Sequence, residues 1–443
     1  MNLIASREPS ETEPRGPREP IASPQQRGMN RVLFLLCLSV LINYIDRSNL
    51  SIAAPLLQTE LGISNTQMGA LLSAFFWTYA LLQTPAGWMV DRFDVKWVFA
   101  IGFLVWSSAT AVTGILHGFM AMLLIRVVLG IGESVAFPSY SKILCGYFPE
   151  ESRGFANALI IAGLALGPAI GILIGGNVVD EFGWRPFFLA LGLVGLLWLI
   201  PWVAWMPRRP QPTRIPLSLW SGWLPLFRQR SAWGTALGQA CVNYFLYFLV
   251  TWLPSYLVRG RHLSMQRMAL DGSLLFLMYA IAATICGKLS DRWISAGSSP
   301  TAVRKGSMAV GCIGLGISMV LTTIAADRFL PQMLALTGIM MGISACATWA
   351  ISQTLAGPEM VGRWTGLQNF VGNLGGAMAP VVTGFLVDRT GSFHWPFLIT
   401  AGVAWIGAFV WTFMIGPIEQ VNWHAAETKI PSTFSPSAQT PLP

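Results

Sequence analysis

Four charged residues lie inside long apolar segments of this chain: Asp46, Arg47, Arg126 and Glu133. Asp46 and Arg47 are neighbours in the segment NYIDRSNLS, residues 43–51. A charge at the centre of a bilayer costs a few kcal/mol on insertion scales, so such residues are rare and mark functional sites. Most other charges lie at predicted helix ends or in loops, where long side chains reach water. We therefore expect the four to share one role.

Helical geometry limits how these charges can pair. Arg126 and Glu133 are two turns apart on one helix face, roughly 10 Å along its axis. Asp46 and Arg47 point about 100° apart and cannot simply neutralise each other. Asp46 therefore needs a partner on another helix, and Arg126 is the predicted partner. Asn43 and Tyr44 share a face with Arg47.

These residue types suit the coupled movement of an anion and protons. Arginine keeps its charge and can bind a carboxylate through two nitrogens, so Arg47 or Arg126 is a candidate anion anchor. A buried carboxyl group can change its protonation with its surroundings, so Asp46 and Glu133 are candidate proton carriers. The ionised set sums to zero, and protonation of the acids makes it positive and ready for an anion. The alternative is a set of ion pairs that only hold helices together.

The second half of the chain supplies neutral polar residues in its apolar segments. Amides and phenols suit the hydroxyl groups of a substrate. They can equally form hydrogen bonds between helices. The candidates are Gln239, Asn243, Tyr244, Tyr247, Ser352, Gln353, Gln368, Asn369 and Asn373, with Tyr79 from the first half.

Composition indicates which elements carry these residues. The chain has 443 residues, 53% hydrophobic and only 11% charged, whereas soluble domains carry about a quarter charged residues. Its apolar residues form blocks long enough to cross a bilayer, without the alternation of a β-barrel. We predict an all-α membrane protein with twelve transmembrane helices, at residues 30–55, 66–90, 96–117, 119–147, 154–179, 185–206, 231–258, 267–291, 304–326, 329–356, 363–387 and 395–416.

Charge distribution predicts the topology. Basic residues concentrate in the loops of one side, so the net charge of +8 indicates cytoplasmic loops and no nucleic-acid partner. We expect disordered cytoplasmic tails at 1–29 and 417–443, a cytoplasmic linker at 207–230, and no signal peptide. The six cysteines all fall in or at the ends of predicted helices, so we expect no structural disulfide.

The two predicted halves, 30–206 and 231–416, repeat each other. GWMVDR (87–92) corresponds to GKLSDR (287–292), and FPEESRG (148–154) to GPEMVGR (357–363). DEFGWRPFF (180–188) likewise corresponds to DRTGSFHWPF (388–397). Duplicated halves around a site at the membrane midplane are typical of secondary transporters.

The stretch from Gly87 to Lys96 resembles the loop motif of the major facilitator superfamily, G-x-x-x-D-R-x-x-x-K. The resemblance implies two six-helix pseudo-symmetric halves and a cytoplasmic gate. Its gating residues would be Asp91, Arg92, Asp291 and Arg292. The second copy departs from the pattern, because its next basic residues, Arg304 and Lys305, lie farther along the chain.

NYIDRSNLS and RVVLGIGESVAFPSYSKILCGYFPEESRG (126–154) resemble the anion:cation symporter family, in particular its galactonate-type sugar-acid carriers. NYFLYFLVTWLPSYL (243–257) and QNFVGNLGGAMAP (368–380) also fit. The resemblance implies proton sites at Asp46 and Glu133. It implies substrate or gating roles for Arg47, Arg126, Tyr44 and Tyr79.

The predicted function is proton-coupled uptake of a hydroxylated organic anion, such as an aldonate or hexuronate, across the bacterial inner membrane, by a protein that works as a monomer. Sodium coupling and a non-sugar carboxylate as substrate remain alternatives. Proton-coupled export of organic anions or drugs is a further alternative, because GLALGPAIG (163–171) resembles the Gly-Pro motif of drug:proton antiporters. No Walker, H-E-x-x-H or G-x-S-x-G motif occurs, so we expect neither an ATPase nor an enzyme, and no cofactor or metal. The duplicated D-R motif argues against a channel or receptor.

Overall fold

The computed structural model describes residues 24–147, 150–207 and 223–423, which are almost entirely helical. The first half contains α1 (Pro24–Leu61), α2 (Asn65–Arg92), α3 (Val95–Thr113), α4 (Phe119–Glu133), α5 (Ala136–Tyr147), α6 (Glu150–Phe182) and α7 (Trp184–Trp205). The second contains α8 (Trp223–Arg228), α9 (Arg230–Ser255), η1 (Tyr256–Gly260), α10 (Met265–Ser295), α11 (Pro300–Ile324), η2 (Asp327–Phe329), α12 (Leu330–Ala345), α13 (Thr348–Thr390), α14 (His394–Phe409) and η3 (Val410–Met414).

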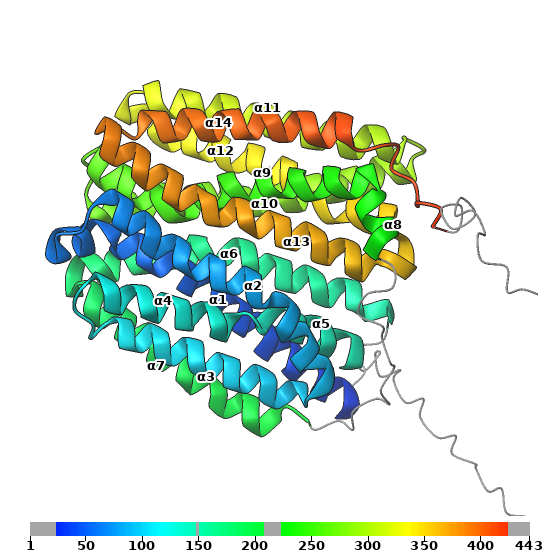
Figure 1. Ribbon diagram of the computed structural model, residues 1–443, viewed down its shortest axis with the longest axis horizontal. Coiled ribbons are helices and arrows are strands. Elements are labelled where there is room, and N and C mark those ends of the chain that lie inside the picture. Colours follow the sequence, from blue (N-terminus) through cyan, green and yellow to red (C-terminus); the bar gives the residue numbers. More distant parts are fainter. Residues whose placement is uncertain (1–23, 148–149, 208–222, 424–443) are drawn as a thin grey trace, which may run out of the picture.

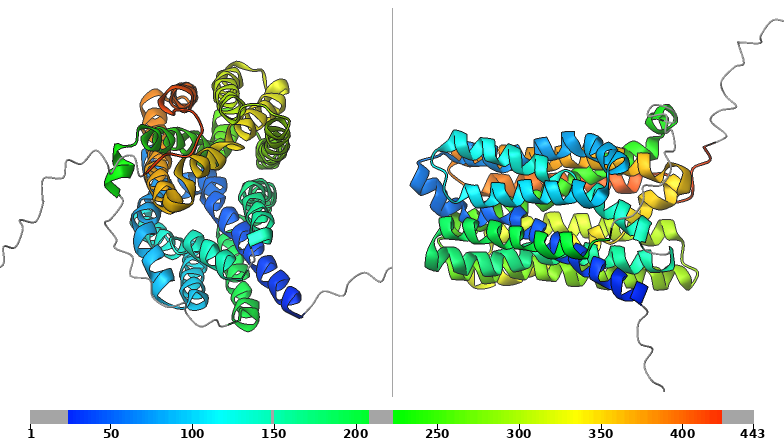
Figure 2. Two further views of the ribbon diagram at one scale, coloured as in Figure 1. Left: turned by 90° about the vertical axis from the view of Figure 1, so that its right-hand side faces the viewer. Right: turned by 90° about the horizontal axis from the view of Figure 1, so that it is seen from below.

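The long helices run side by side through one bundle (Figure 1). α1 begins and η3 ends at the same end, which we call the terminal end, and the other is the opposite end. Seen end-on, the helices of the two halves group on either side of the molecule (Figure 2, left). The predicted all-α membrane fold with two six-helix halves is confirmed.

Eleven segments of the described chain are long and apolar enough to span a membrane. α2 is not among them, although its 28 residues are sufficient in length and it lies within the bundle (Figure 1). It packs against α4 on one side and α13 on the other. α2 therefore lies at the contact between the two halves.

The largest departures from the predicted boundaries occur in three helices. α1 begins at Pro24 and continues past Pro55 to Leu61. The predicted helix 119–147 is interrupted after Glu133, between α4 and α5. α13 covers the end of one predicted span and all of the next, across a kink at Gly357 with a φ of 64°. Residues 1–23, 208–222 and 424–443 of the predicted tails and linker lie outside the described residues.

The repeat of the two halves is visible in the contacts of two lysines, one near the start of α3 and one near the start of α11. Lys96 Nζ donates to the carbonyls of Val203 and Met206, at 2.8 and 2.7 Å. Lys305 Nζ donates to those of Thr412 and Ile415, at 3.0 and 2.6 Å. Both lysines therefore cap the last helix of their half, across the same 107 and 110 residues of sequence. Lys305 thus occupies in the second half the position that Lys96 occupies in the first, although a longer loop separates it from the D-R motif.

The two halves meet closely towards the opposite end. α2 packs along α13, α6 along α10, and α1 against α9. Gly69 and Gly384 allow backbone-to-backbone contact there, since a side chain on either would overlap Pro380 or Asn65. Ser73 Oγ also donates to the Ala377 carbonyl at 2.7 Å, between the same two helices.

A polar network closes the same end. Asp388 accepts hydrogen bonds from the backbone amides of Asn65 and Thr66, at 3.0 and 2.6 Å, at the start of α2. Arg259 donates to the side chains of Gln58 and Asn65. A carboxylate is favoured at a helix N-terminus, so these contacts stabilise the closure of the halves at this end.

Candidate functional site

The candidate site is built on Arg47, a buried residue near the middle of α1. Its Nε lies 3.2 Å from Glu133 Oε2, and its Nη1 donates to the Tyr247 hydroxyl at 3.0 Å. Only 5% of Arg47 and none of Glu133 is exposed. Glu133 belongs to the first half and Tyr247 to the second. One guanidinium therefore links the two halves at mid-depth.

Three aromatic rings hold this guanidinium in position. Its carbon lies 4.8 Å from the ring centroid of Tyr44, 4.6 Å from that of Tyr79 and 5.1 Å from that of Phe75. The rings of Phe75 and Tyr79 stack on each other at 5.4 Å. Cation–π attraction is stronger where water is excluded, so the rings compensate part of the cost of burying Arg47.

Two glycines bring α4, and with it Glu133, close to its neighbours. A Cβ on Gly132 would lie 2.8 Å from the Trp106 backbone nitrogen of α3. A Cβ on Gly130 would lie 2.6 Å from the Phe75 carbonyl of α2. Because these positions have no side chain, α4 packs tightly between α2 and α3 and directs its terminal carboxylate at Arg47.

Part of the hydrogen-bonding capacity of this pair is unused. Arg47 Nη2 and Glu133 Oε1 are buried and have no hydrogen-bond partner within the described chain. A buried donor without a partner costs roughly 1–3 kcal/mol, more when it is charged. An anion that accepted a hydrogen bond from Nη2 would remove that cost.

Asp46 and Arg126 are buried nearby without forming the predicted ion pair; no ion pair between them occurs among the described residues. Asp46 accepts instead from Asn49 Nδ2, one turn further along α1, at 3.4 Å. The Arg126 guanidinium lies over the Phe75 ring at 5.8 Å, and its Nε and Nη1 have no described partner. The pairing prediction was wrong: the ion pair between α1 and α4 is made by Arg47 and Glu133 and not by Asp46 and Arg126.

A small cavity adjoins Arg47 between the two halves. Its lining comes from α1, α6, α9 and α10: Tyr44, Arg47, Leu164, Pro168, Leu246, Tyr247, Val250, Phe276 and Tyr279. Arg47 is the charged residue of this lining, and the remainder is phenolic or apolar. The apolar members of this lining were not predictable from the sequence, because an apolar residue in a transmembrane segment carries no signal that distinguishes a cavity-facing from a lipid-facing position.

The predicted amide residues of the second half bond to one another in this conformation. Gln239 Nε2 donates to Asn243 Oδ1 at 2.8 Å, and Gln368 Nε2 donates to Gln239 Oε1 at 3.2 Å. Ser352 Oγ donates to the Thr348 carbonyl, and Asn373 Nδ2 to the Asn369 carbonyl. These bonds join α9 to α13 or lie within one of these two helices, so a direct role in substrate binding stays a prediction for these residues.

The predicted gating residues stay a prediction as well. Asp291 and Arg292 are exposed near the end of α10, at the terminal end, and Arg92 is exposed at the end of α2. The side chain of Asp91 lies outside the described residues.

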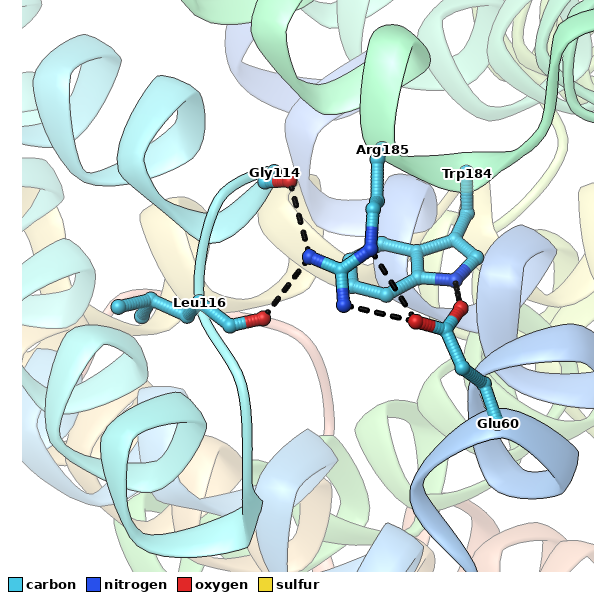
Figure 3. Close-up of polar contacts among 5 residues, drawn as sticks. All are labelled: Glu60, Gly114, Leu116, Trp184 and Arg185. Carbon is cyan, nitrogen blue, oxygen red and sulfur yellow. Dashed lines mark hydrogen bonds and ion pairs between the residues drawn. The ribbon is translucent and has the colours of Figure 1, made fainter.

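A second network of polar contacts, centred on Arg185 at the opposite end, has a structural role (Figure 3). Arg185 contacts Glu60 at 2.7 Å and donates to the carbonyls of Gly114 and Leu116, at 3.3 and 3.0 Å. Trp184 Nε1 also donates to Glu60, at 2.6 Å. These contacts fasten the α3–α4 connection and the end of α1 to the start of α7, so they hold the first half together as one body.

This architecture defines a two-domain membrane transporter, and the comparison with known families agrees. The model of the Major Facilitator Superfamily matches residues 36–380 and 273–438, so the chain belongs to that superfamily. The chain is thus a transporter and not an enzyme.

The curated relatives that the chain resembles are named as transporters of organic anions. The chain is 31% identical to the probable sulfoacetate transporter SauU of Cupriavidus necator, over 88% of this chain and 94% of that protein. It is 29% identical to the hexuronate transporter of Bacillus subtilis, over 87% and 94%. It is 28% identical to the probable L-galactonate transporter of Escherichia coli, over 88% and 90%. The predicted resemblance to sugar-acid carriers is confirmed.

The fold also matches solved structures. A bacterial homologue of the human lysosomal transporter Spinster, in an inward-facing and occupied conformation, superimposes with a TM-score of 0.73 and 19% sequence identity. The match covers 92% of this chain and 99% of that one.

Proposed function

We propose that this protein is a proton-coupled symporter that takes up an organic anion across the bacterial inner membrane. The observation that carries the proposal is the buried Arg47, held by Glu133 and Tyr247, with Nη2 unpartnered beside a cavity. A guanidinium in this situation is a permanent anion receptor. The names of the curated relatives support an organic anion as substrate.

Coupling would follow from competition for Arg47. While Glu133 is ionised, it neutralises the guanidinium and opposes the binding of a second anion. When Glu133 takes up a proton, the guanidinium gains affinity for the substrate carboxylate. Linkage requires the reverse as well: a bound anion must favour protonation by the same factor. Asp46, which interacts electrostatically with both Glu133 and Arg126, is the second proton site in this scheme.

The contacts between the halves suggest the conformational state. The halves are joined at the opposite end by Asp388 and Arg259. We assign the terminal end to the cytoplasm, on the distribution of basic residues. In this conformation the periplasmic side of the protein is closed. The proposal also includes that the protein works as a monomer.

Two classes of organic anion are candidate substrates. A sugar acid fits the sugar-acid transporters among the relatives, and Tyr44, Tyr79 and Tyr247 could bind its hydroxyl groups. A small anion with few hydroxyls, such as a short sulfonate or non-sugar carboxylate, is favoured by the largely apolar cavity lining. Similarity to a probable sulfoacetate transporter supports the second candidate.

Transport by purified protein in liposomes tests the proposal. A first screen measures uptake of radiolabelled D-galactonate, D-glucuronate and sulfoacetate, with an inward-directed proton gradient, a sodium gradient, or neither. We expect the proton gradient alone to drive accumulation of at least one of these anions, with alkalinisation outside. Accumulation under the sodium gradient only would reject proton coupling. Outward movement against the proton gradient would indicate an exporter.

A further inference from the structure

Two glycines allow α10 and α12 to pack closely against each other in the second half. Gly338 and Gly342, one turn apart on α12, face α10, and a Cβ on Gly342 would lie 2.7 Å from the Ala283 backbone nitrogen. A Cβ on Gly338 would overlap the Leu275 carbonyl. Small residues spaced by four allow the backbones of membrane helices to approach this closely.

The next position in this spacing is a cysteine, Cys346, and it meets another cysteine on α10. The sulfur atoms of Cys346 and Cys286 are 3.2 Å apart, and both residues are partly buried and unbridged. A disulfide forms only where two backbones come close to each other. The glycine contacts one and two turns earlier bring the backbones of α10 and α12 into contact on this face.

Cys346 also lies at a break in the helix. α12 ends at Ala345, Cys346 is its C-cap, and α13 begins at Thr348. The same break occurs in the first half, where α4 ends at Glu133 and α5 begins at Ala136. A break between two helical segments is where a transmembrane helix can bend. A covalent bond at Cys346 would therefore join α10 to a candidate hinge.

We propose that Cys286 and Cys346 form an oxidisable dithiol, whose disulfide fixes the α12–α13 break to α10. With a peroxide as oxidant, the thiolate of one cysteine attacks the peroxide, forms a sulfenic acid and releases water. The second thiol attacks that sulfur, and a second water leaves. Overall two thiols and one hydrogen peroxide give one disulfide and two waters.

The chain contains its own comparison pair. Cys241 of α9 and Cys312 of α11 both lie 3.9 Å from a Cβ placed on Gly407. No sulfur–sulfur contact joins them among the described residues, and Cys312 is fully buried. Oxidation should therefore select the Cys286–Cys346 pair.

The experiment treats the full-length protein in detergent with hydrogen peroxide and maps disulfide-linked peptides by mass spectrometry. We expect a Cys286–Cys346 link that dithiothreitol removes, that persists in Cys312→Ser and that is lost in Cys286→Ser. Backbone hydrogen exchange around residues 344–350 should slow on oxidation and recover on reduction, and it should not respond in Cys286→Ser. Both readouts are independent of the transported anion.

Two outcomes would overturn the proposal. One is linkage of Cys241 to Cys312 with equal or greater yield, because the close α10–α12 approach would then not determine reactivity. The other is a Cys286–Cys346 link that leaves hydrogen exchange at the break unchanged, because the bond would then not restrain the hinge.

Discussion

Replacement of Arg47 by lysine tests the central site while keeping its charge. Arg47 contacts Glu133 through Nε and Tyr247 through Nη1, at 3.2 and 3.0 Å, and has Nη2 left over. A lysine has a single nitrogen, which cannot serve three positions at once. Loss of one hydrogen bond to a buried charged group costs roughly 1.5–3 kcal/mol. At 1.4 kcal/mol per factor of ten, anion affinity should fall about 10- to 150-fold.

The assay is equilibrium binding of the anion identified in the uptake screen, together with counterflow in liposomes. Arg267→Lys is the matched control, since Arg267 also pairs with a carboxylate, Asp271 at 2.9 Å, but lies away from the cavity. It should leave affinity within about twofold. If Arg47→Lys also binds within about threefold of wild type, the planar guanidinium is not required and Arg47 acts only as a point charge.

Four further substitutions separate the roles of the surrounding groups. Tyr247→Phe should weaken anion binding roughly tenfold, because Arg47 Nη1 loses its acceptor; Tyr244→Phe, three residues earlier on α9, is the control, and equal effects would contradict the assignment. The Glu133→Gln variant should still bind the anion, with or without an imposed pH gradient, but it should not accumulate the anion in response to that gradient. Accumulation at the wild-type level would show that Glu133 is not part of the proton path. Wild-type affinity should rise as pH falls; Asp46→Asn should show a flatter profile between about pH 5 and 8, and an unchanged slope would make Asp46 structural. Asp388→Asn should weaken the closure at the opposite end by about 1 kcal/mol, seen as longer spin-label distances across that end, whereas unchanged distances would show that the network is not a latch.

Much of the architecture was predictable because it depends on local or periodic properties. The apolar blocks of about 20 residues predict the spans, and repeated short motifs predict two related halves. The rarity of charge in those blocks selects Asp46, Arg47, Arg126 and Glu133, and all four are buried in the structure. Helix ends were less predictable. Pro55 does not stop α1, and α4 breaks after Glu133 where close packing against α2 and α3 decides its path.

The pairing of these residues was decided by tertiary structure. Sequence geometry shows which side chains share a helix face, but the rotation and depth of each helix determine what that face meets. Arg47 therefore pairs with Glu133, 86 residues away, and with Tyr247, 200 residues away, while Asp46 and Arg126 do not pair in the described chain. For the same reason the apolar wall of the cavity and the contact of Cys286 with Cys346 carried no sequence signal: each exists only where separate helices pack against each other.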